Sequence, residues 1–185
     1  MPRAPGKLST EEELYAAAMR ALMRRAHSVH QMRVLLEKRA AEEGLVAPVM
    51  LRLKRGGYLN DARFALEFAR SHARTRHQGK YRIARELRTR GVPDRHVESA
   101  LESAFAEGDE SALLHARVES KRKSLRGPLT RQRYASLYSN LMRAGFAPQD
   151  IRGELNRLRA ELSAGLADPD NTAPETDLDA ELEII

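Results

Sequence analysis

The chain repeats its own apolar pattern, and this internal repeat restricts the fold more than any single motif does. A shift of 54 residues sets Gly91 on Gly145 and aligns four apolar pairs: Ile83 with Leu137, Leu87 with Leu141, Val97 with Ile151, and Leu101 with Leu155. A looser third copy precedes these two, with a few residues inserted around 40–44. One such unit buries only part of its apolar surface, so neighbouring units should stack in a line.

Within each copy the apolar residues recur at helical spacing, and no segment alternates with a period of two for more than a few residues. The predicted fold class is therefore all-α: a tandem array of three three-helix repeats, elongated and open to curvature, with a disordered acidic C-terminal tail. The predicted segments are a flexible basic lead (1–8), repeat 1 (9–58), repeat 2 (59–108), repeat 3 (109–163) and the tail (164–185).

Several residues indicate where these helices begin and end. Thr10 with Glu13, and Ser28 with Gln31, have the spacing of capping boxes. Gly91 should end a helix by adopting a left-handed backbone. Further predictions concern four helix starts: caps at Asn60, Asp109 and Thr130, and Pro93 in a first helical turn.

Charge is distributed unevenly along the 185 residues, whose formal net charge is +6. Residues 166–185 hold seven acids and no base, which leaves 32 basic against 19 acidic residues in the body, a net charge of +13. A body this basic attracts polyanions or acidic protein surfaces at long range. Two simpler interpretations stay open, namely charge that serves solubility alone and a tail that competes with an acidic partner.

Composition excludes several classes of protein. The chain has no cysteine, so disulfides, thiolate metal sites and a cysteine nucleophile are absent. No phosphate-binding loop, dinucleotide fingerprint or nucleophile elbow occurs, and His27 and His30 lack a third metal ligand. We expect no enzyme, no cofactor and no metal. With no apolar run of about 18 residues, we expect a cytoplasmic protein. The remaining histidines should lie at the surface: His72, His77, His96 and His115.

Arginine-rich segments are the candidate binding residues, because the planar guanidinium fork suits carboxylates and phosphates. The first group covers a predicted helical hairpin with few acids nearby, and Tyr81 lies one turn before Arg85, where stacking can add to charge pairing. Its members are Arg70, Arg74, Arg76, Tyr81, Arg82, Arg85, Arg88 and Arg90. The second group surrounds a Gly-Pro turn: Lys121, Arg122, Lys123, Arg126, Arg131 and Arg133. A solvated helix face is the alternative for both. By contrast, Tyr134 and Tyr138 share the apolar stripe and should be core.

One long motif resembles a known family. The run Gly57-Tyr58-Leu59-Asn60-Asp61-x-x-Phe64-Ala65 is followed by Arg70, Gly79, Arg82-Ile83, Glu86-Leu87 and Arg90-Gly91-Val92. This pattern is similar to the central motif of the RecX family, the bacterial regulators of the RecA recombinase. Upstream, Leu22-x-x-Arg25-x-His27-Ser28-x-x-Gln31-Met32 resembles the family's first motif. Gln31 departs from this first motif, in which a glutamate is common, and Lys80 departs from the central motif, in which a proline commonly follows the glycine.

The resemblance implies a regulatory protein that binds the RecA nucleoprotein filament and limits recombinase activity. We also expect a monomer, and weak sequence-independent DNA contact, which is compatible with this function and with the alternative below. Composition and spacing do not by themselves identify RecA as the partner. The alternative is a helix-turn-helix DNA-binding protein, in which the helix from Lys80 to Arg90 enters a major groove and Arg82 and Arg85 reach the bases. A sequence reader usually mixes Asn, Gln and Ser among its basic residues, and this helix has almost none.

Overall fold

The computed structural model describes residues 7–106, 110–123 and 129–164, and over these ranges it is a string of helices. The order is α1 (Glu11–Arg24), α2 (Val29–Arg39), the short 3₁₀ helix η1 (Glu43–Leu45), α3 (Val46–Arg55), α4 (Asp61–Arg76), α5 (Lys80–Thr89), α6 (Asp94–Phe105), α7 (Glu110–Arg122), α8 (Arg131–Ala144) and α9 (Pro148–Ala164). The only extended pairing within these ranges is an isolated bridge between Leu8 and Ala40.

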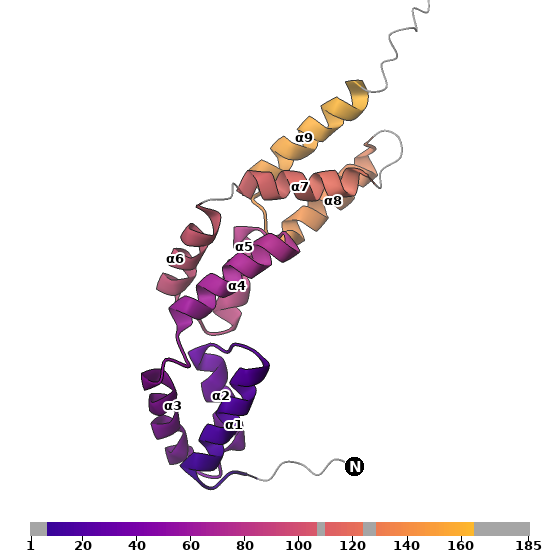
Figure 1. The fold of residues 1–185 in the computed structure, drawn as a ribbon. Helices are drawn as coiled ribbons and strands as arrows, with labels where there is room; N and C mark the ends of the chain where they lie inside the picture. Colours follow the sequence, from indigo (N-terminus) through magenta and orange to yellow (C-terminus); the bar gives the residue numbers. More distant parts are fainter. Residues whose placement is uncertain (1–6, 107–109, 124–128, 165–185) are drawn as a thin grey trace, which may run out of the picture.

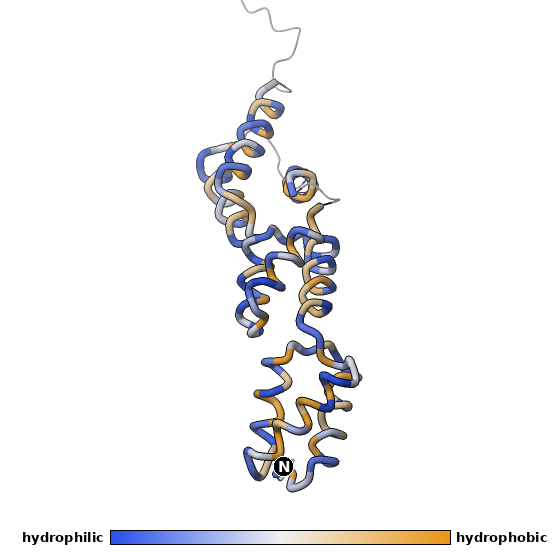
Figure 2. The backbone as a smooth tube through the Cα atoms, turned by 90° about the vertical axis from the view of Figure 1, so that its left-hand side faces the viewer, coloured by the Kyte–Doolittle hydropathy of each residue, from blue (hydrophilic) through white to orange (hydrophobic). Residues whose placement is uncertain are grey.

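Three helix triplets follow one another along the molecule, and each has its own apolar core (Figure 1). We call α1–α3 repeat 1, α4–α6 repeat 2 and α7–α9 repeat 3. Apolar and polar residues are interspersed along the helices (Figure 2), as expected of helices with one buried face. The described residues confirm the predicted all-α array of three repeats, which is elongated and bent. The predicted acidic tail lies outside the described residues, apart from Ala164.

Local capping chemistry sets the helix boundaries much as the sequence predicts. Both capping boxes are formed, at Thr10 and at Ser28, and the side chain of Asn60 accepts a hydrogen bond from the Arg63 amide. Pro93 differs from its prediction: it is the extended residue before α6 rather than part of the first turn. The predicted Asp109 cap lies outside the described residues.

The second helix of repeats 2 and 3 ends at a left-handed glycine, Gly91 with φ of 72° and Gly145 with φ of 91°. In repeat 1, α2 instead ends at an extended Ala40, and η1 follows before α3. Here the loop holds Leu8, whose amide donates to the Arg39 carbonyl at 2.7 Å. Leu8, which belongs to the predicted flexible lead, is therefore held in place, and residues 1–6 of that lead lie outside the described range.

The middle helices of the three repeats pack end to end and so join the repeats. The start of α5 contacts the end of α8, and the start of α2 contacts the end of α5. At the junction of repeats 2 and 3, the Gly79 amide donates to the Ala144 carbonyl at 2.9 Å and the Tyr81 amide to the Gly145 carbonyl at 3.1 Å. The free amides at the start of α5 thus satisfy the free carbonyls at the end of α8. The positive end of one helix dipole also meets the negative end of the other.

The junction of repeats 1 and 2 has the same arrangement, with α2 in the place of α5 and α5 in the place of α8. The Ser28 hydroxyl at the start of α2 donates to the Arg90 carbonyl at the end of α5, at 2.5 Å. The Val29 amide donates to the Asp61 carboxylate at 2.8 Å. At both junctions a left-handed glycine lies against the first turn of the next middle helix, Gly91 against His30 and Gly145 against Arg82. Close backbone approach explains why glycine recurs at these places.

Candidate partner-binding surface

The outer face of α5 carries three side chains spaced as one helical stripe, Tyr81, Arg85 and Arg88. Tyr81 is 66% exposed, which is unusual for a large aromatic side chain in a protein with so few of them. Arg85 is exposed, and no carboxylate among the described residues pairs with it. We call these three residues the α5 stripe.

Arg88 is the weakly engaged member of the stripe. Its Nε lies 2.7 Å from Asp94 Oδ1, and the two side chains are 53% and 67% exposed. An ion pair this open to water contributes only about 0–1 kcal/mol, so an acidic partner can replace Asp94 at little cost. The stripe therefore offers two guanidinium groups and one phenol ring to a docking surface.

Arg82 and Arg90 are placed differently, which corrects the prediction that few acids lie near this group. Glu86 sits between them on α5, 3.0 Å from Arg82 Nε and 3.5 Å from Arg90 Nη1. Arg82 also donates to the Arg143 carbonyl of repeat 3. Arg82 thus links repeat 2 to repeat 3, whereas the Arg90 side chain makes its contacts within repeat 2, with Glu86 and Phe68. The i, i+4 spacing of all three residues is visible in the sequence and was the signal for this pairing.

Electrostatics around Glu86 agree with this structural role. Burial opposes ionisation of Glu86, but the Arg82 hydrogen bond and the charges of His72 and Arg90 outweigh it, so its pKa lies below the ordinary value. The carboxylate is therefore ionised at neutral pH and pairs with both arginines, which leaves the three side chains with a net charge of +1.

His72 is buried, which contradicts the prediction that it lies at the surface. Its ring stacks on Phe68 with centroids 3.7 Å apart, and its Nδ1 lies 2.7 Å from Gln78 Oε1 and 3.9 Å from Glu86 Oε2. The Arg90 guanidinium lies over the Phe68 ring of this stack, 4.4 Å from the ring centroid. Sequence reasoning missed the cluster because its members come from α4, the following loop and α5.

The α4 arginines lie toward the end of that helix. Arg70, Arg74 and Arg76 are exposed, and no acid within the described ranges pairs with any of them. Arg70 and Arg74 are one turn apart, so they share a face of α4. These three residues keep their guanidinium groups available to a partner.

The second predicted group is more occupied than the first. Arg122 pairs with Glu119 at 3.3 Å and with Glu161 at 3.4 Å. Lys121 and Arg133 each have an interaction of their own, Lys123 and Arg131 are exposed, and Arg126 lies outside the described residues. Tyr134 and Tyr138 pack against the repeat 3 core, as predicted, although each is only partly buried.

A further arginine, which the sequence did not single out, bridges repeats 2 and 3. Arg117 donates to the carbonyls of Arg76 and His77, each at 3.2 Å, and its side chain is partly buried. Burial, and then the charge of Arg82, lower its pKa. Nothing in the spacing of α7 distinguishes Arg117 from its neighbours, because its partners lie 40 and 41 residues away.

The described residues hold no cluster of three metal-ligating side chains. No helix within them is long and apolar enough to cross a membrane. A stacked helical array with an exposed Arg and Tyr stripe has the features of a protein that binds an acidic protein surface or a polyanion.

Comparison with known proteins identifies the family. Residues 60–101 match the model of the RecX second three-helix domain. The chain is 35% identical over 145 residues to the regulatory protein RecX of Halorhodospira halophila, covering 78% of this chain and 87% of that one. It is also 35% identical to the regulatory protein RecX of Pelodictyon phaeoclathratiforme, covering 76% and 86%. The chain belongs to the RecX family of regulatory proteins.

The fold agrees with this assignment. The crystal structure of RecX from Lactobacillus salivarius superimposes with a TM-score of 0.64 at 16% identity, covering 80% of this chain and 96% of that chain. A similarity at this identity supports the shared fold, and the family itself rests on the sequence relatives.

Proposed function

We propose that this chain binds the RecA nucleoprotein filament and negatively modulates recombinase activity, including filament growth, ATP hydrolysis and strand exchange. One observation carries the proposal: the middle helix of the middle repeat presents Tyr81, Arg85 and Arg88 outward, while its two other arginines, Arg82 and Arg90, pair with Glu86. The proposed setting is the cytoplasm, with the chain acting as a monomer.

The shape of the array supports a long, repetitive partner. Three stacked repeats place α5 at the centre of an extended body (Figure 1), so a contact made by α5 can be flanked by contacts on both sides. The body's positive charge would favour a filament that contains nucleic acid, in a salt-dependent way. Weak sequence-independent DNA contact is part of the same proposal.

The structure argues against the helix-turn-helix alternative for α5. A recognition helix contacts base edges through its N-terminal residues. In this protein the amides of Gly79 and Tyr81 are bonded to the end of α8, and Arg82 is held by Glu86 and Arg143. The first amides of α5 are therefore occupied by repeat 3, and Arg82 would have to leave Glu86 and Arg143 to reach a base.

The test is ATP hydrolysis by the recombinase on single-stranded DNA at moderate salt, with this chain added at substoichiometric amounts. The chain should inhibit hydrolysis, and the double variant Tyr81→Ala/Arg85→Gln should raise the inhibitory concentration about tenfold, as expected when central interface anchors are removed. Arg152→Gln on α9, an exposed arginine far from the stripe in sequence, is the matched control and should inhibit like the parent chain.

Two results would reverse the proposal. One is an absence of inhibition together with tight binding to a single duplex sequence, which would favour the DNA-binding alternative. The other is equal inhibition by the double variant and the parent chain, which would remove the α5 stripe from the interface.

A further inference from the structure

A basic hollow lies in repeat 1, away from the α5 stripe, and the proposed function does not use it. It lies between the end of α1 and the outer side of α2 and has a volume of about 420 Å³. A second hollow of about 370 Å³ shares Arg25, His27, Leu35 and Arg39 with it. The two form a single groove, which we call the α2 groove.

Every charged side chain that lines the α2 groove is basic. Arg25, Lys38 and Arg39 line the larger hollow, and Arg24, Arg25 and Arg39 line the smaller one. Among the described residues no carboxylate forms an ion pair with any of these four. Four cations gathered without a counter-charge repel one another, and an anion in the groove removes that cost.

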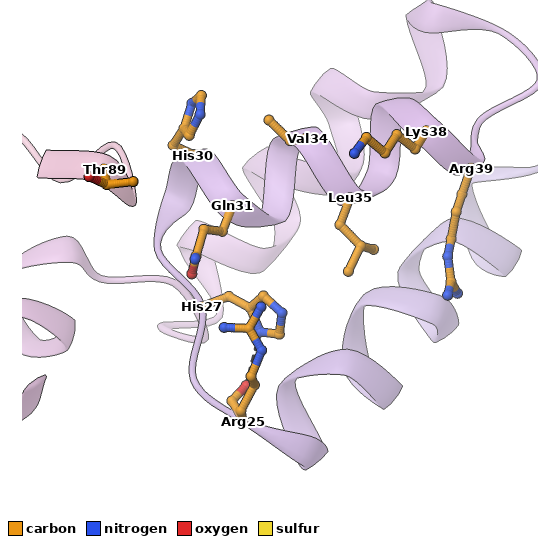
Figure 3. A pocket seen from close by; sticks show the side chains of 9 residues that line it. All are labelled: Arg25, His27, His30, Gln31, Val34, Leu35, Lys38, Arg39 and Thr89. Atoms are coloured by element: carbon orange, nitrogen blue, oxygen red, sulfur yellow. Dashed lines mark hydrogen bonds between the residues drawn. The ribbon is translucent and has the colours of Figure 1, made fainter. Parts of the chain in front are cut away.

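The groove also has an apolar side. Val34 and Leu35 of α2 line it, together with His27, which is 6% exposed, and His30. In Figure 3, Leu35 and Arg39 point from α2 toward α1, and His27 and Arg25 lie in the space between the two helices. A groove with cations and flat or aliphatic surfaces suits a ligand that carries both phosphate and a planar ring.

A hydrogen bond to the backbone fixes the position of the His27 ring. Its Nδ1 lies 2.9 Å from the Arg25 carbonyl, an acceptor, so this nitrogen must carry the hydrogen. Burial, and then the charge of Arg25, lower the pKa of His27, so the ring is neutral at pH 7. The other ring nitrogen is then free to accept a hydrogen bond.

The groove ends at the junction of repeats 1 and 2. Thr89, the last residue of α5, closes it beyond the start of α2 (Figure 3). His30, at the same end, lies against Gly91. A ligand in the groove therefore touches both repeats and would stabilise the angle between them.

From this geometry we infer that the α2 groove binds a nucleotide, with its phosphate on Arg25, Lys38 and Arg39 and its base on Leu35 and the imidazole rings. The nucleotide can belong to a single strand of nucleic acid or be a free nucleoside phosphate, since both present the same chemistry. Nucleotide binding here is independent of the recombinase contact proposed for α5, so either can fail without the other.

The experiment measures binding of two probes to the full chain: a fluorescent 5′-phosphorylated oligo-dT and a fluorescent ADP analogue. At least one should bind, and the double variant Arg25→Gln/Lys38→Gln should weaken that binding by about tenfold or more at low salt. Its salt dependence should fall by about one in log–log slope for each lost phosphate contact. Arg33→Gln on the opposite side of α2 should stay within about twofold of the parent chain.

The two probes distinguish a nucleic-acid strand from a free nucleotide as the ligand, and poly-glutamate tests for an acidic peptide instead. Binding of oligo-dT alone identifies a nucleic-acid strand, and binding of the ADP analogue alone identifies a free nucleotide. A second readout is the His27 ring in NMR titrations, whose pKa should rise when a phosphate offsets the charges of Arg25 and Arg24. The inference is overturned if neither probe binds, if the double variant matches Arg33→Gln, or if poly-glutamate binds in the groove and the nucleotides do not.

Discussion

Replacing Gly79 by alanine should break the junction between repeats 2 and 3. Gly79 has φ of −77°, an ordinary value for any residue, so alanine adds no backbone strain at this position. An added Cβ would however lie below 3.0 Å from the carbonyl of Gly145 and the amide of Phe146, which are backbone atoms that no side-chain rotation can move. Only a separation of α5 from α8 relieves the overlap.

The cost follows from what that separation removes. Two hydrogen bonds are lost, from the Gly79 amide to the Ala144 carbonyl and from the Tyr81 amide to the Gly145 carbonyl. Each contributes about 1 kcal/mol of net stability. Arg82 also loses its bond to the Arg143 carbonyl. With a partial loss of packing at the junction, the free energy of unfolding should fall by about 2–4 kcal/mol for Gly79→Ala.

The assay is equilibrium urea unfolding followed by circular dichroism, with amide hydrogen exchange to locate the change. Gly153→Ala in α9 is the matched control, because nothing lies within 4 Å of its added Cβ and its φ is not positive. That control should gain about 0.5–1 kcal/mol from better helix propensity. If Gly79→Ala stays within about 0.5 kcal/mol of the parent chain, the end-to-end junction does not support the array as described.

Three further predictions follow from other contacts. Glu86→Gln should destabilise the protein by about 1–2 kcal/mol, less than for a fully buried pair because Arg82 and Arg90 are partly exposed; unchanged urea unfolding would contradict this. The hydrogen bond from Arg157 lowers the pKa of Glu154 in the folded protein below its ordinary value of 4.5. Ionised Glu154 therefore stabilises the fold above about pH 4.5, and this stabilisation is lost as the pH falls through the lowered pKa of the folded state. Acid unfolding monitored by circular dichroism should show that loss, and Glu154→Gln should remove it. Deleting the residues after Ala164 should leave thermal stability within about 0.5 kcal/mol, and a larger loss would show that the tail docks.

Much of the fold was readable from the sequence because local chemistry and global packing agree. The two capping boxes, the Asn60 cap and the glycine ends of α5 and α8 all form where the sequence places them. The shift of 54 residues that aligns Gly91 with Gly145 aligns the same structural position in two repeats. Each repeat buries a stripe of apolar residues at helical spacing, which a sequence displays directly.

The candidate surface was less readable, because spacing along one helix does not show what a neighbouring helix contributes. The sequence grouped Arg82 and Arg90 with Arg85, but Glu86 pairs with the first two, and Arg82 also donates to repeat 3. His72 reads as a surface residue in a basic helix, yet Phe68 and Gln78 enclose it.

The most direct measurement of the proposed function is site-specific photocross-linking to the assembled recombinase filament. Arg85→p-benzoylphenylalanine places the cross-linker on the α5 stripe, and Glu98→p-benzoylphenylalanine places it on the exposed surface of α6 as a control. Irradiation with filament formed on single-stranded DNA should give a recombinase adduct from position 85 and little from position 98. An adduct from position 98 with none from position 85 would show that α5 does not face the filament.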